Sequence, residues 1–397
     1  MSQEATTPDA QLMRTALNAF HHAHGAHMVP FNGWEMPLYY TGILDEHAGV
    51  RSGVGLFDVS HMGILTVSGD HAGDLLSRRT TTNTSKMASG QVRYGFWLNS
   101  DGHILDDLLV TRLDDGTQGP PRFLVVPNAG RAASIFDLLQ QHRRPDTLVA
   151  RHNPAIAILA VQGPRAREVL EKIFGWSLAG LKFYTAAAFP AHAGGSPRTG
   201  KLGVHFPEEL GEFIQVSRTG YTGELGYELF VRAEKAPALA EELLRHGARP
   251  AGLGCRDTLR LEKGYLLSGS DFSLDRTPIE AGQERFLDLD HPFVGAEVLQ
   301  AQHTSGPAVK LTGIEVRERG AIPRHGTPLF RGTTQVATLT SGGISPTLGY
   351  GIGLTYLPPE LQAPGTELTV LLRGAQVPAQ VAALPFLRSG PAKPSPS

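Results

Sequence analysis

The residue pattern of this 397-residue chain changes near 301–307, and that change limits what the chain can fold into. Before it, segments with the strand period of two are interspersed with segments at helical spacing. After it, from 308 to 388, short alternating segments are separated by Gly and Pro, with almost no helical pattern. Such segments predict a small β-barrel or sandwich. The segment 301–307 (AQHTSGP) is then the expected linker.

The larger region, 14–300, mixes strands and helices in an order typical of α+β layers, not of a doubly wound parallel sheet. A hairpin is expected around the turn Asn-Ser-Asp-Gly, between strands at 94–99 and 104–111. Helices are expected at 15–24, 71–79, 129–141, 164–173, 236–246 and 255–263. The remaining segments have loop composition, and we expect a loose N-terminus at 1–13, a flexible loop at 191–200 and a disordered tail at 389–397.

Composition argues against several classes of protein. The 36 basic and 38 acidic residues leave a net charge of −2, so nucleic acid is not an expected partner. The single cysteine, Cys255, permits neither an internal disulfide nor a cysteine metal cluster, and no metal is expected. The N-terminus does not resemble a signal peptide, and no apolar run reaches the length of a membrane span. We therefore expect a cytoplasmic protein without a membrane association.

Two adjacent carboxylates, Asp106 and Asp107, lie within the apolar strand ILDDLLV. Because successive side chains on a strand point to opposite faces, only one of them can face a given cleft. A carboxylate among aliphatic residues loses solvation, and its raised pKa suits proton transfer near neutrality. Spacing alone favours the simpler interpretation, a carboxylate that hydrogen-bonds to the backbone of the hairpin.

The segment 218–228 (RTGYTGELGYE) is unusually dense in glycine, tyrosine and charged residues. Its glycines permit a tight turn and a close approach of the backbone. Glu228, on the strand after the turn, can accept two parallel hydrogen bonds from the amide edge of a heterocycle, and Tyr221 can stack on a flat ring. The alternative is a Gly-rich hairpin with surface tyrosines.

A third segment, 254–262 (GCRDTLRLE), places Arg256 and Arg260 one helical turn apart. Guanidinium groups suit carboxylate binding, whereas the alternative is an ion pair within the helix, for example with Asp257. We expect Cys255 to be a buried thiol and not a nucleophile. The histidines at 21, 22, 24 and 27 do not share one helical face, so they predict a solvated cluster and not a metal site.

Together these segments resemble the aminomethyltransferase (T-protein) family of the glycine cleavage system. The resemblance covers the chain from about 15 to 388, and its motifs occur in the family's order. They are MVPFNGWEMPLYY at 28–40, GLFDVSHMG at 55–63, GHILDDLLV at 102–110, AVQGP at 160–164, RTGYTGELGYE at 218–228, PAGLGCRDTLRLE at 250–262 and TSGGISPTLGYGI at 340–352.

The resemblance implies a folate-binding unit of two α/β lobes, ferredoxin-like or Greek-key in topology, followed by a C-terminal β-barrel. It implies transfer of a methylene group from the lipoyl arm of the H-protein to tetrahydrofolate, a co-substrate, with release of ammonia. It also implies roles for residues. Asp107 matches the catalytic carboxylate, Glu228 the carboxylate at the pterin edge, Tyr221 a pterin contact and Met62 an apolar wall. The other matched positions, expected to line the folate or to lie near it, are Tyr94, Asn128, Arg256, Tyr265 and Arg388.

The sequence departs from the family pattern at several positions. Ala16, Pro30 and Cys255 replace the usual residues there, and the segments 268–272 and 282–286 differ from the family's equivalents, while 190–201 is longer than usual. Three alternatives therefore stay open. One is a tetrahydrofolate-dependent demethylase. Another is a folate-binding iron–sulfur assembly factor, although the expected cysteine motif is missing at Lys263-Gly264-Tyr265. The third is a non-catalytic folate-binding module.

Overall fold

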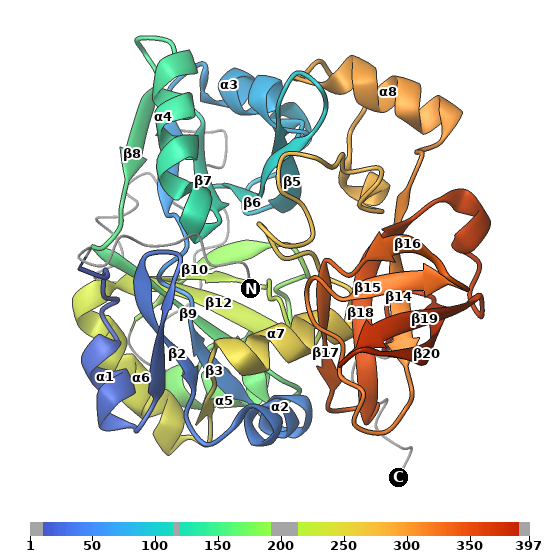
Figure 1. Ribbon diagram of the computed structural model, residues 1–397. Helices are drawn as coiled ribbons and strands as arrows, with labels where there is room; N and C mark the ends of the chain where they lie inside the picture. Colours follow the sequence, from blue (N-terminus) through green and yellow to red (C-terminus); the bar gives the residue numbers. More distant parts are fainter. Residues whose placement is uncertain (1–10, 114–118, 192–212, 389–397) are drawn as a thin grey trace.

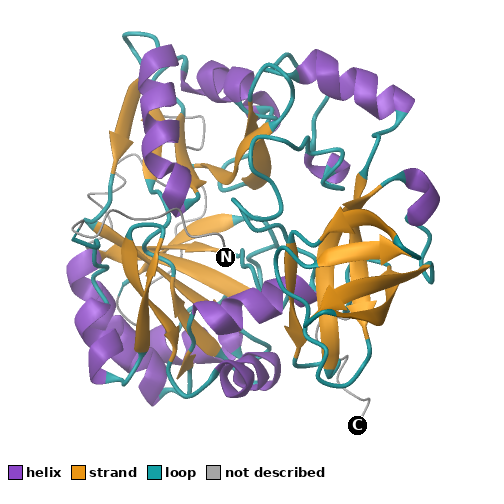
Figure 2. Cartoon of the chain, viewed as in Figure 1, coloured by secondary structure: helices purple, strands orange, loops and turns teal. Residues whose placement is uncertain are grey.

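The computed structural model describes residues 11–113, 119–191 and 213–388. Three sheets with their covering helices lie around a common centre, and Figure 1 shows them as a lower-left, an upper and a right-hand body. Helices cover the outside of the lower-left and upper bodies, and their strands lie nearer the centre (Figure 2). The expected tail at 389–397 lies outside the described residues, and so does the expected flexible loop at 191–200, apart from residue 191.

The first body is a six-stranded sheet with the strand order β10-β11-β12-β9-β3-β13. Its strands are β3 (Gly55–Asp58), β9 (Ile156–Gln162), β10 (Ala186–Pro190), β11 (Phe213–Ser217), β12 (Gly226–Arg232) and β13 (Arg249–Pro250). Among the named strands of the described residues, β13 and β3 alone pair in parallel, as expected for an α+β fold.

Both faces of this sheet are buried, because β9 and β12 supply apolar residues to each side. Leu159 and Leu229 pack on one face with α1 (Asn18–Ala23), α5 (Ala166–Phe174) and α6 (Ala236–Arg245). Ile158, Ala160 and Phe230 face the opposite side, toward the centre of the molecule. The chain therefore builds one core outside this sheet and a second core between this sheet and the next.

The second body is a five-stranded antiparallel sheet with the order β5-β6-β7-β4-β8. Its strands are β4 (Leu65–Ser68), β5 (Val92–Leu98), β6 (Ile104–Arg112), β7 (Arg122–Pro127) and β8 (Leu148–Arg151). One face packs against α3 (Ala72–Arg79) and α4 (Ala132–His142). The other face brings Leu124 and Val126 into the core that it shares with the six-stranded sheet.

The third body is a curled seven-stranded antiparallel sheet, the expected barrel, with the order β16-β15-β19-β20-β14-β18-β17. Its strands are β14 (Lys310–Val316), β15 (Pro328–Arg331), β16 (Thr334–Thr338), β17 (Ser341–Ser345), β18 (Tyr350–Leu357), β19 (Glu367–Leu372) and β20 (Ala375–Ala382). Between it and the first body lies α7 (Leu253–Glu262), beside α2 (Ile43–Ser52) (Figure 1). A separate hairpin, β1 (His27–Phe31) with β2 (Trp34–Tyr39), packs on α7.

Two expectations need correction. The predicted linker 301–307 is helical as far as Ser305, because α8 (Ala296–Ser305) continues until Gly306 takes a positive φ of 80°. The histidine cluster is not solvated throughout, since His21 is fully buried and its Nε2 lies 3.0 Å from Oδ2 of Asp58. The imidazole thereby gains a partner that sequence spacing did not indicate. Within the described residues, no helix has the length and apolar character needed to cross a membrane.

Candidate functional site

Strand β6 separates the two adjacent aspartates. Asp106 points to the same face as Leu108 and Val110, which belong to the core under α3 and α4. Asp107 points to the opposite face with Leu109, which packs against the core shared by the two sheets. Alternation along a strand thus sends Asp107 toward the centre of the molecule and Asp106 away from it.

Asn128 connects the two carboxylates from the end of β7. Its backbone N–H donates to Oδ2 of Asp106 at 2.9 Å, and its Nδ2 donates to Oδ1 of Asp106 at 2.8 Å. The same Nδ2 also donates to Oδ1 of Asp107, while the Tyr94 hydroxyl donates to Oδ2 of Asp107 at 2.7 Å. Burial raises the pKa of both carboxyls, and the charge of Asp107 raises the pKa of Asp106 further. The pair thus favours holding one proton near neutrality.

Glu228 approaches the same centre from the six-stranded sheet. On β12 it points to the same side as Phe230, which belongs to the core between the two sheets. The Thr219 hydroxyl donates to its Oε2, which orients the carboxyl. Burial raises the pKa of Glu228, and the positive charge of Arg256 opposes that effect. Two partly buried carboxyls, Asp107 and Glu228, therefore face the interior from two different sheets.

The side chain of Gln162, the last residue of β9, holds the turn that carries Glu228. The side chain of Gln162 donates to the Thr219 carbonyl at 3.2 Å and accepts from the Thr222 hydroxyl at 3.0 Å. A Cβ added at Gly220 or Gly226 would lie 2.0 or 2.2 Å from Oε1 of Gln162. An added methyl group at either glycine would therefore displace the Gln162 amide from its hydrogen bonds to Thr219 and Thr222.

Aromatic and cationic groups lie beside this turn. The Arg256 guanidinium lies 4.5 Å from the ring centroid of Tyr221, and the Tyr221 hydroxyl donates to the Leu266 carbonyl. The Tyr265 ring lies 5.8 Å from that of Tyr221. Arg256 forms no salt bridge with the described residues, and Tyr221 is its cation–π partner. Its charge therefore remains available for an anionic or carbonyl group.

The other sequence-predicted residues differ in their surroundings. Met62 is partly buried against the core between the sheets. Arg388 is exposed, one residue after Leu387, whose backbone N–H donates to the Glu262 carbonyl. Arg260 has an internal role, because it is buried and ion-paired with Asp271 and Asp257. For Arg260 the alternative interpretation, an ion pair within the helix, is confirmed, and Cys255 is buried as expected.

Several residues near this centre were missed by sequence reasoning. Tyr184 adopts a positive φ of 58°, and burial raises its pKa to about 12, with Glu228 and Asp107 among the charges that act on it. Phe286 packs edge-on against Tyr94, with ring centroids 4.8 Å apart. His61 is buried, and its Nδ1 has no hydrogen-bond partner among the described residues. Burial, followed by the charge of Arg256, lowers its pKa to about 4. The sequence contained one indication of His61, its position directly before Met62, which was already expected to line the site.

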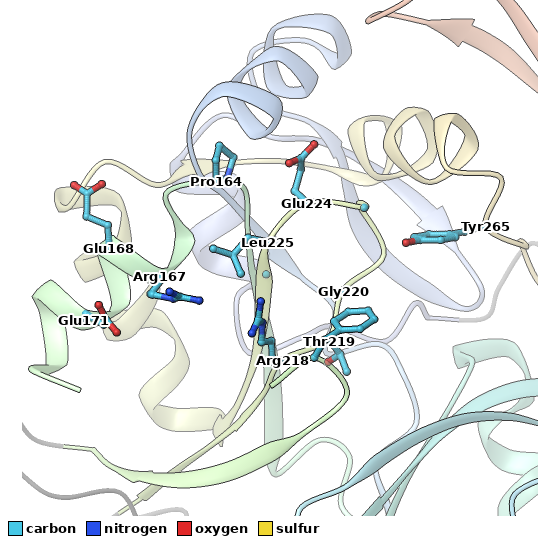
Figure 3. A pocket seen from close by; sticks show the side chains of 13 residues that line it. Pro164, Arg167, Glu168, Glu171, Arg218, Thr219, Gly220, Glu224, Leu225 and Tyr265 are labelled. Carbon is cyan, nitrogen blue, oxygen red and sulfur yellow. The ribbon is translucent and has the colours of Figure 1, made fainter. Parts of the chain in front are cut away.

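A cavity of about 680 Å³ is lined in part by residues of the 218–228 turn. Its lining includes Thr219 and Tyr265, together with Arg167, Arg218 and Glu224 (Figure 3). Asp107, Asn128, Glu228 and Arg256 do not line it. The cavity is therefore a neighbouring space that reaches the site at the Gly220 turn. The described residues bring together no group of three or more His, Cys, Asp or Glu side chains suited to a metal ion.

This arrangement is suited to binding a flat, polar heterocycle. Glu228 offers a carboxyl to a donor edge, Tyr221 offers a ring, and Arg256 offers a cation, while Asp107 faces them from the other sheet. A buried carboxyl with a raised pKa can take and return a proton near neutrality, and its charge stabilises a developing cation in a site of low dielectric.

Comparisons with known proteins cover almost the entire chain. The family model of the GCVT N-terminal domain matches residues 17–197 and 209–291. The model of the glycine cleavage T-protein C-terminal barrel domain matches residues 310–387. The second model coincides with the curled seven-stranded sheet, and the first includes the six-stranded and the five-stranded sheets.

Individual relatives match over the same length. An aminomethyltransferase of Halothermothrix orenii is 38% identical over 381 residues, which is 95% of this chain and 100% of the relative. One from Prochlorococcus marinus strain MIT 9303 is 40% identical over 385 residues, 95% of this chain and 98% of the relative. The crystal structure of glycine cleavage system aminomethyltransferase T from Bartonella henselae matches with a TM-score of 0.83 at 32% identity, covering 95% of this chain and 98% of that one. The chain therefore belongs to the aminomethyltransferase family, the T-proteins of glycine cleavage.

Proposed function

We propose that this enzyme is the tetrahydrofolate-dependent aminomethyltransferase of glycine cleavage. Its substrates are then tetrahydrofolate and the S-aminomethyl-dihydrolipoyl arm of the H-protein. The observation that carries this proposal is the pair of partly buried carboxyls, Asp107 and Glu228, that face one interior from two sheets beside Arg256 and Tyr221. The full-length match to aminomethyltransferases supports this reaction over demethylation or iron–sulfur assembly.

The chemistry of the available groups fits tetrahydrofolate. A pterin presents an amide N–H and an amino group side by side, which a carboxylate accepts as two parallel hydrogen bonds. Glu228 would supply that carboxylate, held in orientation by Thr219. Tyr221 and Tyr94 would supply ring contacts, and Arg256 would bind a carbonyl or carboxylate of the folate. Tyr265, Met62 and Arg388 would complete the walls and contact the glutamyl part.

The reaction balances without a redox partner. The methylene carbon loses its bonds to sulfur and to the amino nitrogen and gains bonds to N5 and N10 of tetrahydrofolate. The two protons from those nitrogens leave with ammonia and with the dihydrolipoyl thiol. Asp107 would carry a proton between these positions, with Tyr94 and Asn128 holding its carboxylate in place. Positioning N5 against the methylene carbon supplies much of the remaining acceleration.

The decisive experiment supplies the purified chain with aminomethylated, lipoylated H-protein and tetrahydrofolate and measures ammonia and 5,10-methylene-tetrahydrofolate. Both products are expected in equal amounts. Absence of both from a folded protein that binds tetrahydrofolate would refute the reaction. A methylated small-molecule donor in place of the carrier tests the demethylase directly.

The Glu228→Gln variant tests the pterin contact. Gln retains the size of Glu but replaces one acceptor with a donor, so it cannot accept two parallel hydrogen bonds. Tetrahydrofolate affinity is expected to fall by about 10- to 100-fold, because a hydrogen bond to a charged group contributes about 1.5–3 kcal/mol. Isothermal titration with tetrahydrofolate measures this change. Unchanged affinity would remove Glu228 from the folate site.

A further inference from the structure

Arg51 lies in α2, outside every motif that identified the family, yet it joins three separate parts of the chain. Its Nη1 donates to the carbonyl of Thr222 and to Oε1 of Glu224, both at 2.8 Å. Its Nη2 donates to Oε2 of Glu262 at 2.6 Å, and its Nε donates to the same oxygen at 3.2 Å. We propose that Arg51 is a positioning residue that sets tetrahydrofolate affinity by holding the 218–228 turn, an inference that rests on the proposed function.

These ion pairs are protected from water. The side chain of Arg51 is 14% exposed, that of Glu224 is 10% exposed, and that of Glu262 is fully buried. Charged hydrogen bonds in such surroundings are stronger and less screened than those at a surface. The planar guanidinium can serve two carboxylates and a carbonyl at once, which an ammonium group cannot do with the same geometry.

The turn is thus held from two sides. Gln162 supports it from β9 through Thr219 and Thr222, and Arg51 supports it from α2 through Thr222 and Glu224. Tyr221 lies between these anchored positions and stacks under Arg256. Without Arg51, the turn would lose its α2 support, and Tyr221 and Glu228 could shift relative to Asp107 on the other sheet.

Glu262 extends this connection to the barrel. It accepts from the hydroxyl of Ser345, the last residue of β17, at 2.5 Å and from the backbone N–H of Thr347, between β17 and β18, at 3.0 Å. The same carboxylate therefore fixes Arg51 and the barrel loop. A continuous path of hydrogen bonds therefore runs from the barrel through Glu262 and Arg51 to the 218–228 turn.

The test measures tetrahydrofolate affinity and steady-state kinetics for full-length Arg51→Met, Glu224→Gln and their combination. Each single variant is expected to bind tetrahydrofolate about 10- to 100-fold more weakly, because small displacements of positioning groups have effects of that size. The KM for the aminomethylated carrier should stay unchanged. The double variant should lose little more than Arg51→Met alone, since both changes remove the same contact. Arg51→Lys should be intermediate.

Arg165→Met is the matched control. Arg165 forms a 2.8 Å ion pair with Glu168 on α5, with side chains 56% and 60% exposed, and makes no side-chain contact with the turn. The Arg165→Met variant should bind tetrahydrofolate with the same affinity as the unmodified chain.

The outcomes separate the inference from the proposed function. If the unmodified chain binds no tetrahydrofolate, the proposed function fails. If it binds, and the folded Arg51→Met and Glu224→Gln variants bind within about twofold of it, the positioning role is wrong. Should Arg51→Met not fold, Glu224→Gln decides alone, because Arg51 keeps its pair with Glu262 there.

Discussion

At the residue scale, Asp106 and Asp107 show how one peptide bond separates two environments. Asp106 accepts from the backbone N–H and from the side-chain amide of Asn128, and it faces the core under the helices. Asp107 accepts from the Tyr94 hydroxyl and from the amide of Asn128, and it faces the interior between the sheets. Asp106 therefore has the surroundings of a structural carboxyl, and Asp107 those of a reactive one.

Replacing each aspartate with asparagine should separate these roles. Asp107→Asn should lower kcat by about 100-fold or more, the usual contribution of an acid–base group. It should unfold at the same or a higher temperature at pH 7. Burial raises the pKa of Asp107 in the folded protein, so the folded protein loses stability as pH rises and this carboxyl ionises. An asparagine does not ionise and therefore avoids this loss. Tyr94 and Asn128 can still bond with an amide at this position.

Asp106→Asn should act on stability instead. Asn128 directs two donors at residue 106, its fixed backbone N–H and its Nδ2, but an asparagine there has only one acceptor oxygen. One donor of Asn128 would then face the amide NH₂ group, which costs about 1–3 kcal/mol. Rate assays and urea unfolding of both variants measure these effects. A larger loss of rate in Asp106→Asn than in Asp107→Asn would contradict the assignment.

At the element scale, the 218–228 turn depends on the end of β9. The turn needs glycine at 220 and 226 because the Gln162 amide lies where their side chains would be. Strands β12 and β9 pair along the register Gly226↔Gln162 to Arg232↔Ile156, so the sheet places the Gln162 amide under the turn. The geometry around Glu228 is therefore set by strand pairing and not by the turn sequence alone.

Gly226→Ala should destabilise the chain by about 1–3 kcal/mol, the usual cost of overpacking, and should weaken tetrahydrofolate binding. Combining it with Gln162→Ala should cost less than the sum of the two single changes, because the shorter side chain makes room for the added methyl group. Gly180→Ala is the control, since no atom lies within 4 Å of a Cβ there. Additive effects in urea unfolding would show that the clash is not the cause.

At the scale of the whole molecule, Glu262 is the junction between the barrel and the rest of the chain. It bonds to Arg51 of α2 and to Ser345 and Thr347 of the barrel, and its Oε2 lies 3.3 Å from Nε2 of His47. Burial opposes ionisation, but the hydrogen bond and charge of His47, with the hydrogen bonds of Ser345 and Arg51, lower the pKa of Glu262 to about 2. The ionised carboxylate thus stabilises the contact of α2 and α7 with the barrel.

Glu262→Gln should therefore lower stability by about 3 kcal/mol at pH 7, the scale of a broken buried ion pair. The sign of the pH effect follows from the lowered pKa. The stabilisation is present above the unfolded pKa of about 4.3 and is lost as pH falls toward 2. The difference in unfolding free energy between the two proteins should shrink over this range. A difference that stays constant down to pH 2 would show that shape, and not charge, is responsible.

The local sequence was sufficient to predict most of the elements. Alternation located the hairpin of β5 and β6, and helical spacing located α3, α4, α6 and α7 to within a few residues. The predicted linker was wrong as far as Ser305, because 301–305 continue α8 as a largely exposed helical end, where the Thr277 hydroxyl donates to Oε1 of Gln302 at 2.6 Å. Each of Asp107, Glu228 and Arg256 lies in a motif on a separate element, so local sequence could not show that they come together. Only the resemblance of these motifs to those of a family suggested it.

By itself, the sequence determined the local preferences: which segments are strands, where glycine permits a turn, and that only one residue of the Asp106–Asp107 pair can face a cleft. Tertiary structure decided which face is the interior, because a strand's alternation leaves two equivalent choices until another sheet packs on one of them. It also decided that Arg51 meets Thr222, 171 residues away, and that Gln162 supports Thr219. Such contacts arise from the packing of distant elements, and no local pattern contains the distance between them.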